Sequence, residues 1–410
     1  MKTPASRTEK SPLAELLDLR QPPAAESPPC GFALWRLGFR PFYLLASVFA
    51  SLSIALWGAQ YAGWLRAPYL RGSIWHAHEM LFGFTLAVMT GFLLTAVRNW
   101  TSRPTPTGIP LAALALLWLA GRILVLTPFG ISAAAVNVLF PLAVALGIGV
   151  PLVRCGNRRN FFFIALLVLI SAGELATHLA LLDIISLPDR LGLQLALDVI
   201  LLVMTVVGGR VIPMFTSNGV REATVRRNAL VEWLVPASAV ALIFADLLSL
   251  PAALLATILA IGAVAQGARV LLWGPWQTYR VPLVWILHVG YLWIPVHLAL
   301  RALSEFDVVV SPLATHALTV GAIGALTLGM MTRTARGHTG RTLIADRYEI
   351  AAFVLVIAAG ITRVFVPLAL QGSYREAIIA SACLWSAAYA IYAARYWLVL
   401  TRPRVDGKPE

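Results

Sequence analysis

The sequence predicts an all-α membrane protein, a polytopic bundle of about twelve transmembrane helices with both termini in the cytoplasm. Three observations lead to this class. Hydrophobic residues make up 59% of the 410 residues and charged residues only 12%, about half the share that is usual in soluble domains. Apolar runs of about twenty residues, the length that crosses a ~30 Å hydrocarbon layer as a helix, recur along the chain. The basic residues gather in alternate loops between these runs.

The apolar runs define the expected elements in order. Residues 1–30 are polar and contain no apolar core, so we expect a flexible cytoplasmic tail and no signal peptide. Residues 31–400 form the transmembrane domain, and residues 401–410 form a second cytoplasmic tail. The seventh and eighth crossings meet at Leu250 and Pro251, which leaves a very short connection. The predicted crossings are 42–64, 76–97, 108–127, 132–153, 161–182, 191–214, 230–248, 250–273, 282–303, 311–332, 347–370 and 376–398.

The net charge of +13 follows from the distribution of arginine and lysine among the loops. Basic residues occupy both termini and the loops after the even-numbered crossings, whereas the opposite loops hold few. This asymmetry is the positive-inside pattern of membrane proteins, and it places both termini in the cytoplasm. It explains the charge better than a nucleic-acid partner does, so we expect membrane lipid around the chain and no nucleic acid.

Histidine is the sharpest indication of function, because ionisable groups are costly at membrane depth and imidazole commonly binds haem iron and copper. His76, His78 and Glu79 begin the second crossing. His316 lies about one turn inside the tenth crossing, which starts at the same membrane surface. Glu174 and His178, near the end of the fifth crossing, could share this layer.

The spacing of the second-crossing residues restricts what they can bind together. Two residues along a helix turn side chains about 200° apart, so His76 and His78 bind one ion only if the first turn is irregular. Otherwise one is a ligand and the other serves a neighbouring site. Glu79 lies on the face of His76. We therefore assign Glu79 as the candidate catalytic group, which orients an imidazole or carries protons. The alternative is a hydrated helix start that these residues merely cap.

The ninth crossing carries a second type of histidine environment. His288 has Trp285 three residues before it and Tyr291 three residues after it, a lining that suits a flat macrocycle. Such an aromatic stripe is also typical of ordinary helix packing. His297 lies about 13 Å further along the same helix, so it does not share an ion with His288.

A group of arginines collects at the predicted cytoplasmic surface. Arg98 follows the second crossing, Arg210 lies in the sixth, and Arg333, His338 and Arg341 follow the tenth. Guanidinium groups suit carboxylates and phosphates, so the arginines are candidates for binding haem propionates, a lipid or another anion. The alternative is that they only set topology and meet lipid headgroups.

Seven motifs in order resemble the NnrS family, which comprises bacterial membrane proteins that bind haem and copper and are linked to nitric oxide metabolism and nitrosative stress. The resemblance implies a candidate site of His76, His78, Glu79, His288, His316 and His338 with Arg210, Arg333 and Arg341. We assign these five histidines as metal ligands, and the three arginines together with Arg98 as cofactor-binding residues. His178 and His297 lie outside the motifs and receive low weight. The motifs are GFRPFYLLA (38–46), WHAHEMLFGF (75–84), GFLLTAVRNWT (91–101), GRVIPMFTSN (209–218), LHVGYLWIP (287–295), HALTVGAIG (316–324) and MTRTARGHTGR (331–341).

The function that the resemblance implies is that of a haem protein in the bacterial inner membrane, with copper as an additional cofactor and nitric oxide as its partner. Nitric oxide would be either bound or turned over at histidine-ligated metal. If it is turned over by a redox reaction, the chain is a haem-dependent oxidoreductase. The sequence does not identify an electron donor. Two other classes stay open: a transporter of a metal, haem or small ion, and a haem-binding sensor or assembly factor.

Overall fold

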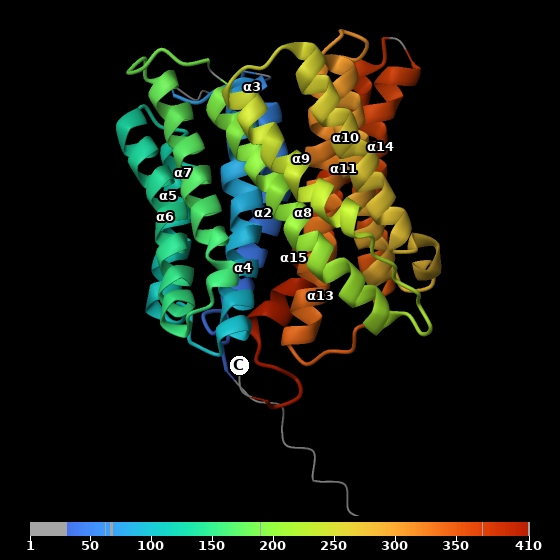
Figure 1. Cartoon of the computed structure of the whole chain (residues 1–410). Coiled ribbons are helices and arrows are strands. Elements are labelled where there is room, and N and C mark those ends of the chain that lie inside the picture. The colour runs from blue at the N-terminus through green and yellow to red at the C-terminus, as the bar shows by residue number, and fades with distance from the viewer. Residues whose placement is uncertain (1–30, 62, 66–68, 189, 371, 409–410) are drawn as a thin grey trace, which may run out of the picture.

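A computed structural model describes residues 31–408, apart from 62, 66–68, 189 and 371, and the chain is helical in twelve successive segments (Figure 1). The predicted tail 1–30 lies outside the described residues. The segments are α2 (Phe39–Tyr61); α3 (Gly72–His78), η1 (Glu79–Thr85) and α4 (Leu86–Thr101) in one run; α5 (Ile109–Leu124); α6 (Gly130–Cys155); η2 (Arg158–Asn160) and α7 (Phe162–Leu181); α8 (Leu191–Gly219); α9 (Ala229–Leu247); α10 (Ala252–Leu272), followed by η3 (Pro275–Thr278); α11 (Pro282–Ser304); α12 (Ser311–His316), η4 (Ala317–Ile323) and α13 (Gly324–His338) in one run; α14 (Arg347–Ala369); and α15 (Tyr374–Thr401).

These segments confirm the predicted fold class. Eleven of the described helices are long and apolar enough to cross a membrane, and the twelfth segment, α5, is a shorter apolar helix. The brief connection between α9 and α10 does separate two helices, as predicted. Several segments run further than expected, most of all α8 to Gly219 and α13 to His338, because a helix that leaves the hydrocarbon layer can continue among polar groups.

The first and last helices close the bundle. Helices that follow one another in the chain pack as neighbours, and α15 packs against α2. The backbone N–H of Ala33 donates to the Thr401 carbonyl over 2.8 Å, and the buried Arg40 guanidinium donates to the Leu400 and Arg402 carbonyls, each over 2.8 Å. Both ends of the described chain therefore lie at one end of the bundle, which we call the terminal end (Figure 1). That this end faces the cytoplasm stays a prediction.

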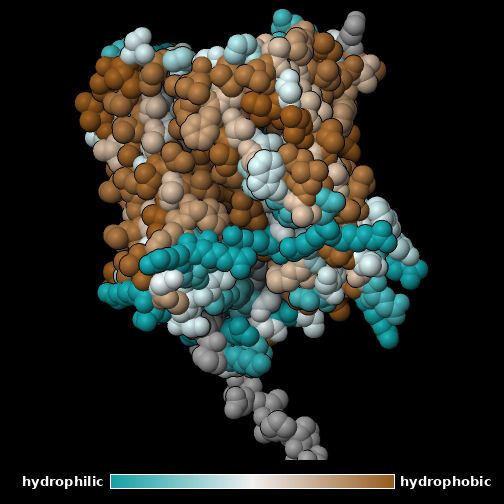
Figure 2. All heavy atoms as spheres, in the orientation of Figure 1, coloured by the Kyte–Doolittle hydropathy of each residue, from teal (hydrophilic) through white to brown (hydrophobic). Residues whose placement is uncertain are grey.

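The segment Gly72–Thr101 occupies the middle of the bundle. Its most apolar window is 83% buried within the protein, compared with 28% for the peripheral Ala229–Leu247. Apolar residues cover the visible side of the molecule, and hydrophilic residues gather toward the terminal end (Figure 2). His78 and Glu79, near the start of Gly72–Thr101, are fully buried and thus face other helices and not lipid.

Two π-helical stretches interrupt the runs that carry the predicted histidines. The stretch η1 begins at Glu79, directly after His78, and η4 begins at Ala317, directly after His316. Such wide turns are rare in proteins and occur frequently at functional sites. Glycine lets a neighbouring helix approach the second stretch closely, since a Cβ atom at Gly324 would lie only 2.5 Å from the Trp385 ring. Close packing here holds η4 against the neighbouring helices.

Candidate metal centre

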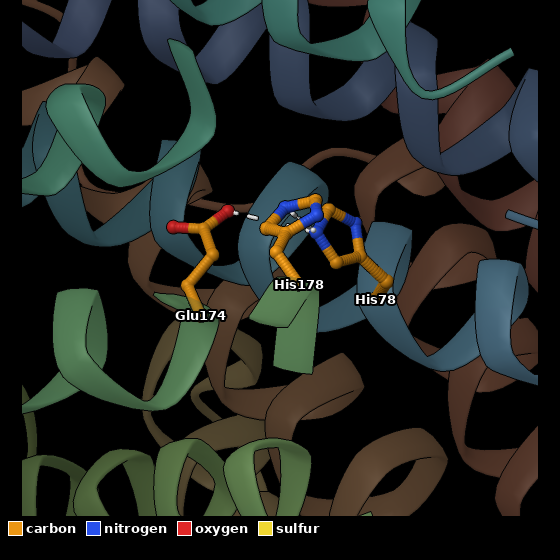
Figure 3. Close-up of side chains that lie close together, drawn as sticks. All are labelled: His78, Glu174 and His178. Atoms are coloured by element: carbon orange, nitrogen blue, oxygen red, sulfur yellow. Dashed lines mark hydrogen bonds and ion pairs between the residues drawn. The ribbon is translucent and has the colours of Figure 1, made fainter. Parts of the chain in front are cut away.

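Three buried side chains converge near the end of the bundle opposite the termini. His78 comes from α3, and Glu174 and His178, one helical turn apart, come from one face of α7. His78 Nε2 lies 3.2 Å from His178 Nε2 and 3.7 Å from Glu174 Oε1 (Figure 3). All three ligand atoms fall within 4.8 Å of one another, and each residue is at most 1% exposed. We call these residues the histidine cluster.

The spacing of the two imidazoles fits one bound metal ion. Ligand atoms with bonds of ~2.0–2.1 Å in a tetrahedral site stand roughly 3.3 Å apart, close to the observed 3.2 Å. Each ring also has a partner for its other nitrogen. His78 Nδ1 donates to Glu79 Oε1 over 2.8 Å, and His178 Nδ1 lies 2.7 Å from the Tyr69 hydroxyl. The first bond leaves the His78 Nε2 lone pair free for a metal, which is the usual arrangement around metal-bound histidine.

A direct hydrogen bond between the two rings is the competing explanation of their contact. It requires a proton on His178 Nε2, with the Tyr69 hydroxyl donating to His178 Nδ1. If His178 carries its proton on Nδ1 instead, two lone pairs face each other across 3.2 Å, and a cation between them removes the repulsion. The two tautomers of His178 therefore correspond to a metal-free and a metal-binding cluster.

A buried ion pair supports His78 from the other side. Arg122 Nη1 donates to Glu79 Oε1 over 2.8 Å, and Arg122 Nη2 donates to Asn137 Oδ1. The Asn137 amide in turn donates to the Ala133 carbonyl over 2.8 Å. Gly83 makes room for this guanidinium, because a Cβ atom there would lie 2.6 Å from Arg122 Nη1. The helices α5 and α6 thereby fix the carboxylate that orients the His78 ring.

The charges around the histidine cluster favour a cation. Glu79 and Glu174 contribute two carboxylates against the single guanidinium of Arg122, and both carboxylates keep one buried oxygen without a hydrogen-bond partner. A buried charge without compensation is costly in a protein interior. Since Arg122 is committed to Glu79, Glu174 needs either a proton or a bound cation.

His76 and His316 form a separate pair. Their rings are nearly parallel, with an interplanar angle of 12° and centroids 6.5 Å apart, and the Trp57 ring lies 4.9 Å from His76. His316 Nδ1 donates to the Pro312 carbonyl over 2.6 Å, which leaves its Nε2 free. Imidazole is a common ligand of haem iron, so His76 and His316 are the residues here that would hold a haem. His76 and His78 thus lie beside different partners, His316 and His178 respectively, as their 200° separation predicts.

A comparison with protein-family models matches residues 33–404 to the family described as NnrS protein. The chain belongs to the NnrS family. The matched residues span every helical segment from α2 to α15, so the family fold is the whole bundle. A comparison with curated proteins finds no match.

In this NnrS-family chain the other two predicted metal ligands lie apart from both histidine groups. His288 is buried on α11, where its Nε2 lies 2.8 Å from Thr216 Oγ1 and its ring lies 6.2 Å from Trp273. His338 ends α13 at the terminal end, against the Phe39 ring. The five predicted histidines therefore occupy four places, and only His76 and His316 pair with each other.

The four predicted arginines of this NnrS-family protein do not surround one shared site. Arg210 donates to Asn160 Oδ1 over 3.0 Å, whereas the Arg333 guanidinium lies 3.9 Å from the centre of the Phe215 ring. Arg341 follows α13, where burial and nearby cationic groups, Arg40 among them, lower its pKa. Arg98 is half-buried in the last turn of α4.

The structure places beside His78 residues that lie outside the family motifs. His178 and Glu174 were placed in the right layer, and their four-residue spacing was the signal that both face one side of α7. Arg122 and Asn137 were not selected, although each lies within an apolar run, where polar groups are expensive. The sequence does not indicate a role for Tyr69, because tyrosine is common at membrane interfaces.

Proposed function

We propose that this NnrS-family chain is an intramembrane metalloprotein that acts in nitric oxide metabolism or protection from nitrosative stress. It binds a transition metal ion at His78, Glu174 and His178, and haem between His76 and His316. The observation that carries the proposal is the convergence of two buried imidazole nitrogens 3.2 Å apart, each ring being held by a partner at its other nitrogen. The predicted location is the bacterial inner membrane.

Copper is the metal that this donor set favours within the proposal. Imidazole nitrogens with a carboxylate oxygen suit Cu(II) well, and copper forms the most stable complexes of the divalent first-row metals. Three protein donors leave a position for a small ligand. Nitric oxide is small and apolar, so it reaches a buried site through lipid without a polar channel.

The chain's own residues have distinct roles in this proposal. His78 and His178 hold the ion, and Glu174 offsets its charge. Glu79, the predicted catalytic residue, orients the His78 ring, while its second oxygen, which has no partner, is available to take up a proton. Haem, when bound between His76 and His316, supplies or accepts single electrons.

The test is metal analysis and optical spectroscopy on one purified sample, in the reduced, oxidised and nitric-oxide-bound states. We expect about one non-haem metal ion per chain, which His178→Gln and Glu174→Gln remove without removing haem. His316→Gln should remove the haem spectrum and keep the other metal. The matched control is His297→Gln, a buried histidine whose Nδ1 donates to the Ala314 carbonyl, and it should change neither signal.

Two results would overturn the proposal. One is a metal content that His178→Gln leaves intact, which would place the ion elsewhere. The other is a reconstituted protein that binds neither haem nor metal, or that releases both on simple dialysis. The second result would favour the transporter class.

A further inference from the structure

A cavity of about 370 Å³ lies between α4, α7 and α8, toward the terminal end of the bundle and on other residues than the histidine cluster. Its walls are of two kinds. Phe92, Phe163 and Met214 are among the apolar residues, and Asn160, Arg159 and Arg210 are among the polar ones. The space therefore suits a molecule with an apolar part and a polar part.

The polar side of the cavity carries positive charge without a matching carboxylate. No acidic residue lines it, and none of the ion pairs among the described residues involves Arg159 or Arg210. Arg210 Nη1 donates to the neutral Asn160 Oδ1 over 3.0 Å, and its guanidinium lies 5.3 Å from the centre of the Phe162 ring. Two guanidinium groups around one cavity attract an anion, and their fork of N–H donors suits a phosphate.

The cavity lies where a lipid headgroup would meet the protein. Trp100 comes at the end of α4 and Arg159 in η2, directly before α7 begins. The Trp100 ring stacks on Phe163 with centroids 5.6 Å apart and keeps 36% of its surface exposed. Tryptophan and arginine are the typical residues of the membrane–water boundary, so the charged side of the cavity is at headgroup depth and its apolar side faces the acyl chains.

We propose that this cavity binds one anionic phospholipid, whose phosphate contacts Arg159 and Arg210 and whose acyl chain lies along Phe92, Phe163 and Met214. A free inorganic anion would use the charge but leave the apolar volume unfilled. A zwitterionic lipid would fill the volume but leave the two positive charges less well compensated. An anionic lipid would both fill the apolar volume and compensate the positive charge. This proposal does not depend on the proposed metal site.

The test uses the full chain in detergent, with binding of defined lipids followed by native mass spectrometry and thermal unfolding. Phosphatidylglycerol should bind and stabilise, whereas phosphatidylcholine and inorganic phosphate at equal concentration should do so much less. Arg210→Gln should weaken phosphatidylglycerol binding roughly fivefold, the effect of one cation near an anionic lipid. The matched control is Arg221→Gln, which removes the same charge from a side chain that is 96% exposed in the loop after α8.

Equal binding of phosphatidylcholine and phosphatidylglycerol would overturn the proposal, as would an Arg221→Gln effect as large as that of Arg210→Gln. Stabilisation by inorganic phosphate alone would reduce the cavity to a simple anion site and would also overturn it. If Arg210→Gln fails to fold, Arg159→Gln gives the same test, because Arg159 is exposed and its loss leaves the packing intact.

Discussion

The histidine cluster and the ion-pair network at the terminal end both bury charge, but they satisfy it to different degrees. In the network, Glu349 accepts hydrogen bonds from Arg336 Nε over 2.8 Å, from the Asp346 backbone N–H over 2.9 Å, and from the Tyr396 hydroxyl. Around the histidine cluster, Glu79 and Glu174 each keep an oxygen without a partner. A saturated network holds helices together, whereas carboxylate oxygens without donors leave negative charge that a bound cation would offset.

The largest expected effect comes from removing Arg122, the cation that pairs with Glu79 beside the histidine cluster. Arg122→Met leaves the Glu79 carboxylate buried without its partner, which should lower the free energy of unfolding by about 3–5 kcal/mol. Chemical or thermal unfolding in detergent measures the change. The double variant Glu79→Gln with Arg122→Met should recover much of the loss, because it removes the stranded charge. No recovery would show that Arg122 acts through packing and not through its charge.

A smaller loss is expected from the saturated network, without any loss of metal. Glu349→Gln removes charge-assisted hydrogen bonds with Arg336 and Tyr396 and should cost about 2–3 kcal/mol. Metal content, measured on the same sample as the unfolding temperature, should stay unchanged. A folded Glu349→Gln protein without bound metal would contradict this prediction, because it would show that the network at the terminal end also controls metal binding.

The next effect separates metal binding from stability at the histidine cluster itself. Tyr69→Phe removes only the hydroxyl that lies 2.7 Å from His178 Nδ1. Metal affinity should fall about tenfold, as is usual when a group that orients a metal-bound histidine is removed, while the unfolding temperature changes little. Competition with a chelator of known affinity measures this. Unchanged metal affinity would indicate that Tyr69 does not set the tautomer of His178.

The smallest effect concerns the helix cap that joins the terminal-end network. Asp346 caps α14 by accepting from the Tyr348 and Glu349 N–H groups, so Asp346→Ala should cost about 1 kcal/mol at neutral pH. Burial acts to raise the pKa of Asp346, but the Glu349 backbone N–H and the Arg395 guanidinium outweigh it and hold the pKa below its usual range. The native state therefore favours the ionised form.

The sign of the pH dependence follows from that lowered pKa. The stabilisation is complete above the pKa of an unfolded aspartate, ~3.9, and is lost as the pH falls through the lower native pKa. Unfolding temperatures of the wild type and Asp346→Ala should thus differ at pH 7 and converge in acid. A gap that widens in acid would contradict the assignment.

The sequence predicted the helices well because hydropathy is a local property. Each predicted crossing has a helical counterpart, including the pair that meets near Leu250 and Pro251. It also predicted that His76 and His78 face different ways, since helix geometry alone decides this. The partners of His78 could not be read in the same way, because they depend on which helices become neighbours. Only the packing of the α3–η1–α4 run beside α7 brings His178 and Glu174 to it.

Local irregularity set a second limit on sequence reasoning. The π-helical turns at Glu79 and Ala317 do not show in the hydropathy pattern, which predicts an unbroken crossing in each case. The arginines show the same limit in another form. Arg210 and Arg333 are both predicted at the same membrane surface, yet one borders a cavity and the other covers the Phe215 ring. Neither position follows from the spacing of residues along the chain.

The seam between α2 and α15 has a consequence for how each copy is made. Trp385 Nε1 donates to the Ala50 carbonyl over 3.1 Å, and Ser51 Oγ donates to the Ser386 carbonyl over 3.1 Å, so residues 335 positions apart complete one wall. α15 leaves the ribosome long after α2, and until then α2 lacks the neighbour that covers this face. This wall of the bundle is therefore complete only after α15 has been synthesised. A chain cut short before Tyr374 leaves that face of α2 open to lipid and to the proteases that remove incomplete proteins.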